Sequence, residues 1–256
     1  MKHLLALDIG NTNIVAGVYD GEQLVAHWRA ATDAQKTADE YAVLLASFFT
    51  QRGLQLSQIG SCIMACVVPP LVTPFADLAR RYLGVEPLIV GTGIKVGVRI
   101  LTDNPREVGA DRVVNALAAR KLYGLPAIVI DFGTATTFDA VSVEGDYLGG
   151  AIAPGIGIAA EALFQRAAQL PRIDLLFPPR AIGKNTVHSM QSGVLYGYVA
   201  MVEGLTKRIK AELGGEAKVI ATGGLAELVA SKTEVIEFVD QNLTIEGLRL
   251  IYEMNQ

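Results

Sequence analysis

One sequence pattern occurs twice in this chain, at an offset of 123 residues. The two segments are ALDIGNTNIVAGV, which contains Asp8 and Gly10, and VIDFGTATTFDAV, which contains Asp131 and Gly133. Each copy has an apolar run, an Asp-x-Gly turn, a second apolar run and then a Gly-containing hairpin signal. A repeat with so long a period, seen twice, indicates a duplicated domain rather than a solenoid. The sequence therefore predicts two lobes of similar architecture.

The apolar residues around the two copies alternate between strand and helix periods, which is typical of an α/β fold. They predict strands over 4–7, 14–19, 24–28, 61–68, 87–90, 127–130, 137–143, 147–152 and 218–222. They predict helices over 37–49, 71–83, 110–122, 156–168, 186–213, 225–231 and 244–253. Thr37 and Glu40 form a capping-box pattern at the start of the first helix. We therefore expect an N-terminal lobe over 1–122 and a C-terminal lobe over 123–256.

The composition excludes several other classes of protein. Apolar residues make up 51% of the 256 residues and charged residues 19%, so the chain is not disordered. A net charge of −4 is not the positive charge that is typical of proteins that bind DNA or RNA, and we expect no nucleic-acid partner.

Cys62 and Cys66 lie four residues apart on a predicted strand, too far for a disulfide, so we expect buried thiols. Without a recognisable signal peptide or membrane-spanning run, we expect a cytoplasmic protein that does not bind membranes.

The two Asp-x-Gly turns have the residue types of a phosphate site. An Asp at the end of a buried strand costs free energy unless it is solvated or paired, and the glycine permits close backbone approach to a ligand. Asn11, Thr12 and Asn13 add short polar groups beside backbone N–H groups, which suits a phosphate with a cation at the Asp. The alternative is that both turns only connect strands. The second copy and the later Gly223-Gly224 junction favour a nucleotide, although the chain has neither a GxxxxGK[ST] nor a GxGxxG motif.

Six segments carry a resemblance to a known family. They are DIGNTNIVAG (8–17), DNPREVGADRVVNA (103–116), DFGTATTFDAV (131–141), GGAIAPG (149–155), NTVHSMQSG (185–193) and ATGGLA (221–226). In this order and spacing they resemble type III pantothenate kinases, within the sugar-kinase, Hsp70 and actin superfamily. The resemblance implies duplicated ribonuclease H-like (actin-like ATPase) domains, each a mixed sheet flanked by helices. It also implies ATP-dependent phosphorylation of pantothenate to 4′-phosphopantothenate, the first step of coenzyme A biosynthesis.

The resemblance also implies roles for individual residues. The residues that it implies bind ATP are Asp8, Ile9, Gly10, Asn11, Thr12, Asn13, Ile14, Val15 and Thr134. Pantothenate binding falls to Thr102, Gly109, Ala110, Asp111, Arg112 and Thr186. Asp111 is the implied catalytic proton acceptor, Asp8 the implied Mg²⁺ ligand through water, and Asp131 the implied ligand of a monovalent cation, K⁺ or NH₄⁺. The resemblance further implies a homodimer, and Thr102 replaces the aromatic residue that the family usually has at this position.

Each of these residues also has an ordinary structural interpretation. Asp111 could be a first-turn acid that complements the helix dipole, Arg112 could pair with Glu107, and Thr186 could cap the helix that follows. A protein of another class could use the same scaffold, namely a non-catalytic nucleotide-binding transcriptional accessory factor. A sugar or acetate kinase is a third alternative. The complete set of Asp8, Asp111, Asp131 and Arg112 favours the kinase, because a regulator would be free to lose it.

Overall fold

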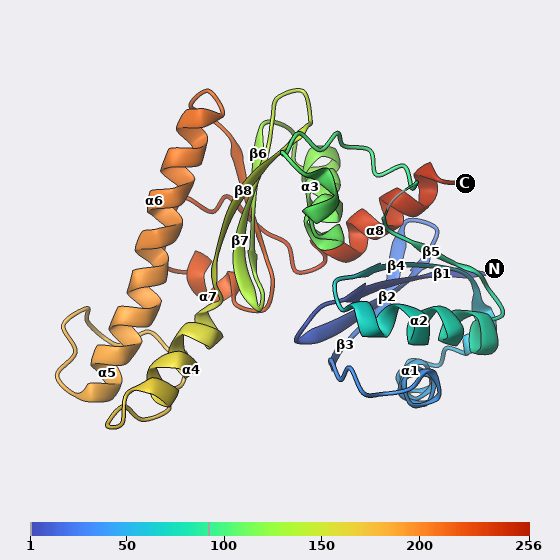
Figure 1. Cartoon of the computed structure of the whole chain (residues 1–256), viewed down its shortest axis with the longest axis horizontal. Coiled ribbons are helices and arrows are strands. Elements are labelled where there is room, and N and C mark those ends of the chain that lie inside the picture. The colour runs from blue at the N-terminus through green and yellow to red at the C-terminus, as the bar shows by residue number, and fades with distance from the viewer. Residues whose placement is uncertain (1, 92) are drawn as a thin grey trace. The chain divides into compact units, whose positions relative to one another are not determined.

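The computed structural model describes residues 2–91 and 93–256 and divides them into two compact units (Figure 1). Unit 1 contains the described residues of 1–98, 104–118 and 242–256, and unit 2 contains 99–103 and 119–241. Each unit has one mixed five-stranded sheet flanked by helices, so the α/β class predicted from the pattern of apolar residues is confirmed. The lobe limits 1–122 and 123–256 stay a prediction, since the compact units are assembled from several chain segments.

Unit 1 is built on a sheet with the strand order β3-β2-β1-β4-β5. Its strands are β1 (His3–Ile9), β2 (Asn13–Asp20), β3 (Gln23–Ala31), β4 (Ile59–Cys66) and β5 (Pro87–Ile89). Its helices are α1 (Ala38–Gln51), η1 (Leu56–Gln58), α2 (Pro69–Leu78), η2 (Ala79–Leu83), η3 (Pro105–Glu107), the first part of α3 (Ala110–Leu122), and α8 (Leu243–Met254). Strands β1, β2 and β3 are antiparallel neighbours, whereas β4 and β5 run parallel to β1.

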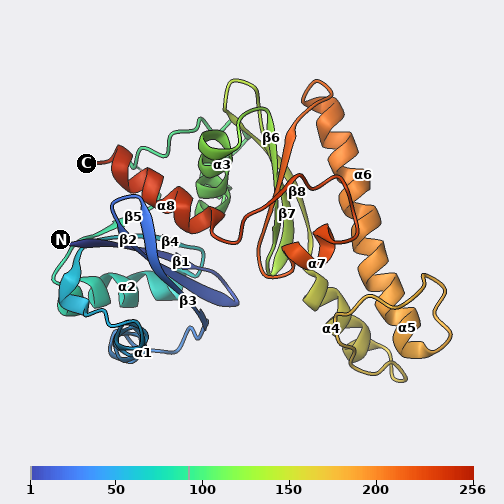
Figure 2. The ribbon, with the colours of Figure 1, turned by 180° about the vertical axis from the view of Figure 1, so that it is seen from behind.

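The two faces of this sheet are covered by different helices. Helices α1 and α2 lie on one face, and α8 lies on the other (Figures 1 and 2). Helix α1 begins at the predicted capping box, where Thr37 N donates to Glu40 Oε2 at 2.8 Å. On this face Trp28 stacks on Phe49 with 5.2 Å between ring centroids, which joins β3 to α1 in the core of unit 1.

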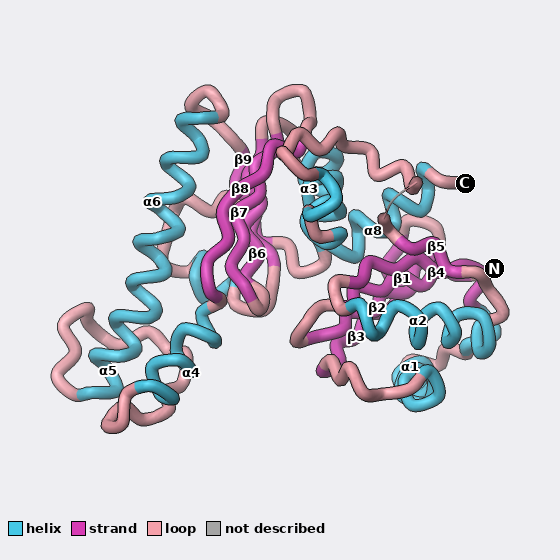
Figure 3. Tube along the Cα trace, in the orientation of Figure 1, coloured by secondary structure: helices cyan, strands magenta, loops and turns pink. Residues whose placement is uncertain are grey.

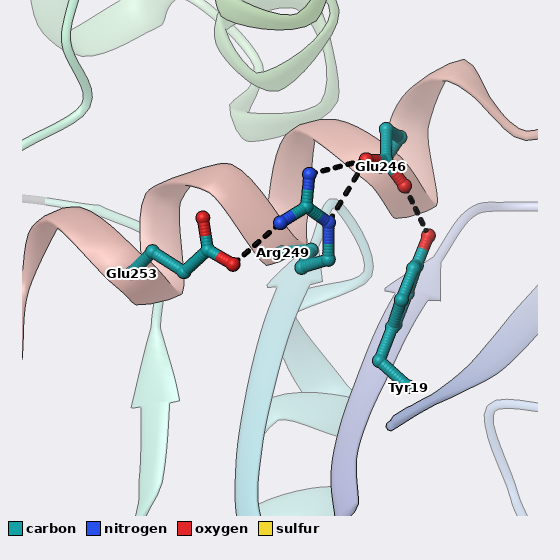
Figure 4. A network of polar contacts seen from close by, with 4 residues as sticks. All are labelled: Tyr19, Glu246, Arg249 and Glu253. Atoms are coloured by element: carbon teal, nitrogen blue, oxygen red, sulfur yellow. Dashed lines mark hydrogen bonds and ion pairs between the residues drawn. The ribbon is translucent and has the colours of Figure 1, made fainter. Parts of the chain in front are cut away.

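Helix α8 is fixed to the other face of the sheet by a partly buried polar network (Figure 4). The Tyr19 hydroxyl on β2 donates to Glu246 Oε2 at 2.8 Å, and the Arg249 guanidinium donates to Glu246 Oε1 and to Glu253. Both Tyr19 and Arg249 are buried. A Cβ atom at Gly17 would lie 2.4 Å from a methyl carbon of Ile245, so only glycine lets the helix approach this closely.

Removal of the Arg249 guanidinium should destabilise unit 1. We expect Arg249→Ala to lower the free energy of unfolding by about 2 kcal/mol, because it leaves the Glu246 carboxylate without its charged donor. Urea unfolding measured for both proteins tests this value. Arg249→Lys keeps the charge but loses the forked hydrogen bonds, and we expect an intermediate loss of stability. Equal stability of Arg249→Ala and the unmodified chain would contradict the assigned role.

Unit 2 is built on a second sheet with the strand order β10-β9-β6-β7-β8, drawn in magenta in Figure 3. Its strands are β6 (Ala127–Phe132), β7 (Ala135–Val141), β8 (Tyr147–Pro154), β9 (Lys218–Thr222) and β10 (Phe238–Val239). It contains the last part of α3. Its other helices are α4 (Ile156–Arg166), α5 (Thr186–Gln191), η4 (Ser192–Tyr196), α6 (Gly197–Glu212) and α7 (Ala226–Ala230). Alternate residues of β6, among them Ile128 and Ile130, pack into the core of this unit.

The two sheets share the arrangement that the repeat predicts. In unit 1, β1 pairs antiparallel with β2 and parallel with β4. In unit 2, β6 pairs antiparallel with β7 and parallel with β9.

Both cysteines are free thiols, and burial raises the pKa of Cys62 to about 12. Within the part of the chain that the structure describes, none of the helices combines the length and the apolarity needed to cross a membrane.

Candidate functional site

In unit 1 the first Asp-x-Gly turn joins β1 to β2 and is tied down by its own backbone. Gly10 N donates to Asn13 O at 3.0 Å, which closes the turn. From the segment after β3, Thr32 donates through its hydroxyl to Gly10 O at 2.6 Å and through its N–H to Thr12 O at 3.0 Å. The side chains of Asn11, Thr12 and Asn13 are exposed. Because Thr32 binds the carbonyl groups of Gly10 and Thr12, the turn is fixed in place. Because its side chains are exposed, an anionic ligand can reach it.

The same edge of the sheet carries the start of helix α3. Strands β1 and β4 are parallel, so their carboxyl ends meet, and Val67 N donates to Ile9 O at 3.0 Å there. A Cβ atom at Gly109 would lie 3.8 Å from Val67 Cγ1 and 2.5 Å from Asp111 Oδ1. Unit 1 therefore brings the predicted ATP-phosphate turn and the predicted pantothenate segment to one edge of its sheet.

Asp111 lies in the first turn of α3, as predicted. Its Oδ1 accepts a hydrogen bond from Arg112 N at 2.8 Å. Burial raises the pKa of the Asp111 carboxyl, and the Arg112 hydrogen bond and charge oppose this rise. A carboxylate whose pKa is raised is a better proton acceptor than an ordinary surface Asp, while a residue on a helix is rigidly aimed.

A divalent cation at this edge would have few protein ligands. Asp8 is half-buried near the end of β1. No group of three or more His, Cys, Asp or Glu side chains that could hold a metal occurs among residues 2–91 and 93–256. This donor set does not fit an all-protein metal cage. It fits Mg²⁺, which is commonly held by one or two carboxylates, water and substrate phosphates.

In unit 2 the second Asp-x-Gly turn lies at the edge where β6 and β9 end. Asp131 on β6 is in register with Thr222 on β9, and a Cβ atom at Gly223 would lie 2.5 Å from Asp131 Oδ1. Gly155 N donates to Thr134 O at 3.1 Å, which connects the end of β8 to the turn. The half-buried Asp131 thus lies close to the Gly223 junction, and the exposed Thr134 is hydrogen-bonded to Gly155.

Three further predicted substrate residues are Thr102, Arg112 and Thr186, of which Arg112 follows Asp111 on α3. Thr102 belongs to the short segment 99–103 of unit 2, and Arg112 is half-buried in unit 1. Thr186 is the first residue of α5 and is exposed. Its alternative role as the helix cap is wrong, because the side chain of Asn185 caps α5 by accepting from His188 N at 2.8 Å. Asn104 donates a hydrogen bond to Glu107 through its side-chain amide at 2.6 Å.

Two glycines of the second turn region are absent from the predicted site residues. A Cβ atom at Gly155 would lie 2.2 Å from Thr134 O, and Gly223 has a φ of +91° beside Asp131. Both glycines occur in segments that the sequence singles out, GGAIAPG and ATGGLA. What the sequence does not reveal is that each of them is packed directly against the second Asp-x-Gly turn.

Comparison with known families gives a match over most of the chain. A family model described as type III pantothenate kinase matches residues 4–208. A protein of that name from Moorella thermoacetica is 56% identical over 252 residues, which cover 98% of this chain and 99% of that protein. Another protein of that name, from Myxococcus xanthus, is 54% identical over 252 residues, which cover 98% of each.

Solved structures support the fold. A Campylobacter jejuni protein described as a conserved Baf family transcriptional activator has a TM-score of 0.65 at 18% identity, covering 98% of each chain. The inorganic polyphosphate/ATP-glucomannokinase from an Arthrobacter species has a TM-score of 0.52 at 14% identity, covering 100% of each chain. A ROK family glucokinase from Streptomyces griseus has a TM-score of 0.51 at 14% identity, covering 99% of each chain. The predicted duplicated ribonuclease H-like fold is therefore confirmed.

Proposed function

Because the chain belongs to the type III pantothenate kinase family, we propose that it phosphorylates pantothenate with ATP. The product would be 4′-phosphopantothenate, so the reaction would be the first step of coenzyme A biosynthesis. The structural observation that supports the proposal most strongly is the position of Asp111. This partly buried carboxyl lies at the start of a helix, at the sheet edge that also carries the Asp8 turn.

In the proposed reaction, Asp111 accepts the proton of the pantothenate hydroxyl group as that oxygen attacks the γ-phosphorus of ATP. The bond from this phosphorus to the bridging oxygen breaks, and ADP leaves. The turn from Asp8 to Val15 positions the ATP phosphates through its backbone, and Thr134 contacts the nucleotide. Mg²⁺, held near Asp8 through water, would neutralise charge that develops on the phosphate oxygens. Most of the catalysis then comes from positioning and electrostatic stabilisation.

The purified chain with ATP, Mg²⁺, K⁺ and pantothenate provides the direct test. We expect ADP and phosphopantothenate to form in equal amounts, measured by a coupled assay and by mass spectrometry. Binding of ATP without turnover would overturn the proposal and favour the non-catalytic nucleotide-binding alternative. Turnover of a sugar or acetate in place of pantothenate would favour a different kinase of the superfamily.

Arg112 is expected to bind the pantothenate carboxylate with two parallel hydrogen bonds. Arg112→Ala should therefore raise the pantothenate KM by about 10- to 100-fold while the ATP KM changes little. Initial rates over a matrix of both substrate concentrations separate the two constants. Equal increases in both KM values would show that Arg112 supports the fold or the nucleotide instead.

Asp131 is expected to hold a monovalent cation. Such a cation would offset the negative charge that this carboxylate adds near ATP and would replace the lysine of P-loop kinases. We expect K⁺ or NH₄⁺ to support activity and Na⁺ to support much less. Initial rates at equal ionic strength in the three chloride salts test this, and equal rates would remove the cation from the mechanism.

Two broader properties belong to the same proposal. We propose that the chain forms a homodimer and that it acts in the cytoplasm. Two free thiols, of which Cys62 is buried and Cys66 half-buried, are compatible with a reducing compartment. Sedimentation equilibrium of the purified chain tests the dimer, since a monomer at micromolar concentration would contradict it.

A further inference from the structure

Residues 99–103, which we call the strap, belong to unit 2 although the segments before and after them belong to unit 1. The strap contains Thr102, one of the residues that are expected to bind pantothenate. Beyond the strap, the chain reaches Gly109 and Asp111 within eight residues. In the sequence, the strap therefore lies just before the segment that is proposed to bind pantothenate.

The strap is hydrogen-bonded to the first residue of β8. Tyr147 N donates to Arg99 O, and Leu101 N donates to Tyr147 O, both at 2.8 Å. Ile100 and Tyr147 form a parallel bridge at this point. Tyr147 is fully buried, and its hydroxyl donates to Asp139 Oδ1 at 2.8 Å. The backbone of the strap is therefore attached to a residue that is itself fixed within unit 2.

A forked ion pair holds the same end of the strap. Arg99 Nε donates to Asp146 Oδ1 at 2.7 Å, and Arg99 Nη2 donates to Asp146 Oδ2 at 2.5 Å. The Asp146 side chain is 7% exposed and that of Arg99 is 73% exposed. The hydrogen bonds from Arg99 hold the pKa of the Asp146 carboxyl below its ordinary value. Asp146 is also fixed by its backbone, because its N–H donates to Ser142 Oγ and its carbonyl accepts from Ser142 N.

This attachment determines the surroundings of Thr102. Gly149 has a φ of +107°, and a Cβ atom there would lie 3.6 Å from the Thr102 methyl carbon. The Thr102 hydroxyl oxygen is buried and has no hydrogen-bond partner among the residues that the structure describes. A buried hydroxyl in this condition costs free energy unless a ligand or water satisfies it. The strap therefore contains a buried, unsatisfied hydroxyl whose position depends on Arg99 and Asp146.

We propose that Arg99 and Asp146 are positioning residues for the phosphoryl acceptor, and that Thr102 offers this acceptor a hydrogen bond. Neither member of the ion pair needs to touch the substrate. Their forked contact holds the strap against β8 and so fixes the hydroxyl that the acceptor meets. The alternative is an ordinary surface ion pair, which would contribute little to stability and nothing to substrate binding. This inference rests on the proposed function.

The test compares Arg99→Gln, Asp146→Asn and the double variant with the unmodified chain. We expect each single variant to raise the pantothenate KM at least about tenfold and to leave the ATP KM within twofold. The double variant should be no worse than the worse single variant, because both changes remove the same contact. Hydrogen exchange at the Leu101 and Tyr147 amides should speed up in all three proteins.

The control is the Arg80–Glu86 ion pair of unit 1, which is also forked, with distances of 2.7 and 2.8 Å, and is exposed. Glu86→Gln should change neither KM. An unchanged pantothenate KM or unchanged exchange in the Arg99 and Asp146 variants would overturn the inference, as would equal increases in both KM values. If the unmodified chain does not phosphorylate pantothenate, the proposed function itself is wrong. That result is obtained before any variant is made, so it is distinguishable from a failure of the inference.

Discussion

Asp111→Asn should lower kcat for pantothenate phosphorylation by about 100- to 10,000-fold while ATP still binds. The amide has almost the size of the carboxyl group but cannot accept the proton of the attacking hydroxyl. Its oxygen can still accept the hydrogen bond from Arg112 N that the structure shows, so α3 should begin as before. Single-turnover kinetics and calorimetric titration with ATP measure the two effects separately.

The control for this variant is a first-turn acid of another helix in unit 1. Asp39 lies in the first turn of α1, where it complements the helix dipole and pairs with Arg81. Asp39→Asn should cost only a few tenths of a kcal/mol of stability and should leave kcat unchanged. If Asp111→Asn also keeps near-normal kcat, Asp111 is a dipole-complementing residue and not the base.

The pH dependence provides a second test of the same assignment. Burial raises the pKa of the Asp111 carboxyl, and only the ionised form can accept a proton. The value of kcat/KM should therefore fall on the acid side as the pH drops through a pKa above the ordinary 3.8 of an Asp. The residual activity of Asp111→Asn should lack this acid limb.

The local sequence signals predicted most of the elements of this fold. The capping box at Thr37 and Glu40 starts α1, and the two repeated turns join β1 to β2 and β6 to β7. These features are local, so the residues that specify them are neighbours in the chain. Strand β10 was missed because two residues, 238–239, are too few to show a period.

What the sequence could not reveal depends on long-range packing. Helix α8 was predicted from its apolar period, but nothing in that period says that it joins unit 1 through Tyr19 and Glu246. Likewise, Arg99 and Asp146 lie 47 positions apart, and each looks like an ordinary surface charge in the sequence. Candidate-site residues within motifs were predictable, whereas the residues that support them became visible only in the fold.

Gly223→Ala should lower the stability of the protein more than any other substitution named here, and it should disturb the proposed cation site in unit 2. Gly223 has a φ of +91°, which side-chain-bearing residues adopt at a cost of about 1–3 kcal/mol. The added Cβ atom would also lie 2.5 Å from Asp131 Oδ1 and 2.7 Å from the Phe132 carbonyl carbon. Overpacking of this kind costs about 1–3 kcal/mol, so we expect a total loss of about 3 kcal/mol or more in urea unfolding.

The same substitution should disturb the proposed cation binding by Asp131 at temperatures where the protein is still folded. The Cβ atom can be accommodated only if the Asp131 carboxylate or the backbone at Phe132 moves, and Thr222 is in register with Asp131 on β9. In the fraction that remains folded, activation by K⁺ should therefore be lost. Initial rates with and without K⁺, at a temperature where the variant is folded by circular dichroism, measure this loss.

A glycine in open space provides the control for Gly223→Ala. Gly204 lies within α6, and a Cβ atom there would meet no other atom within 4 Å. Gly204→Ala should stabilise the protein by up to about 1 kcal/mol through helix propensity and should leave activation by K⁺ unchanged. If Gly223→Ala matches Gly204→Ala in stability and in its response to K⁺, then Gly223 does not constrain Asp131, and the second turn is only a connection between strands.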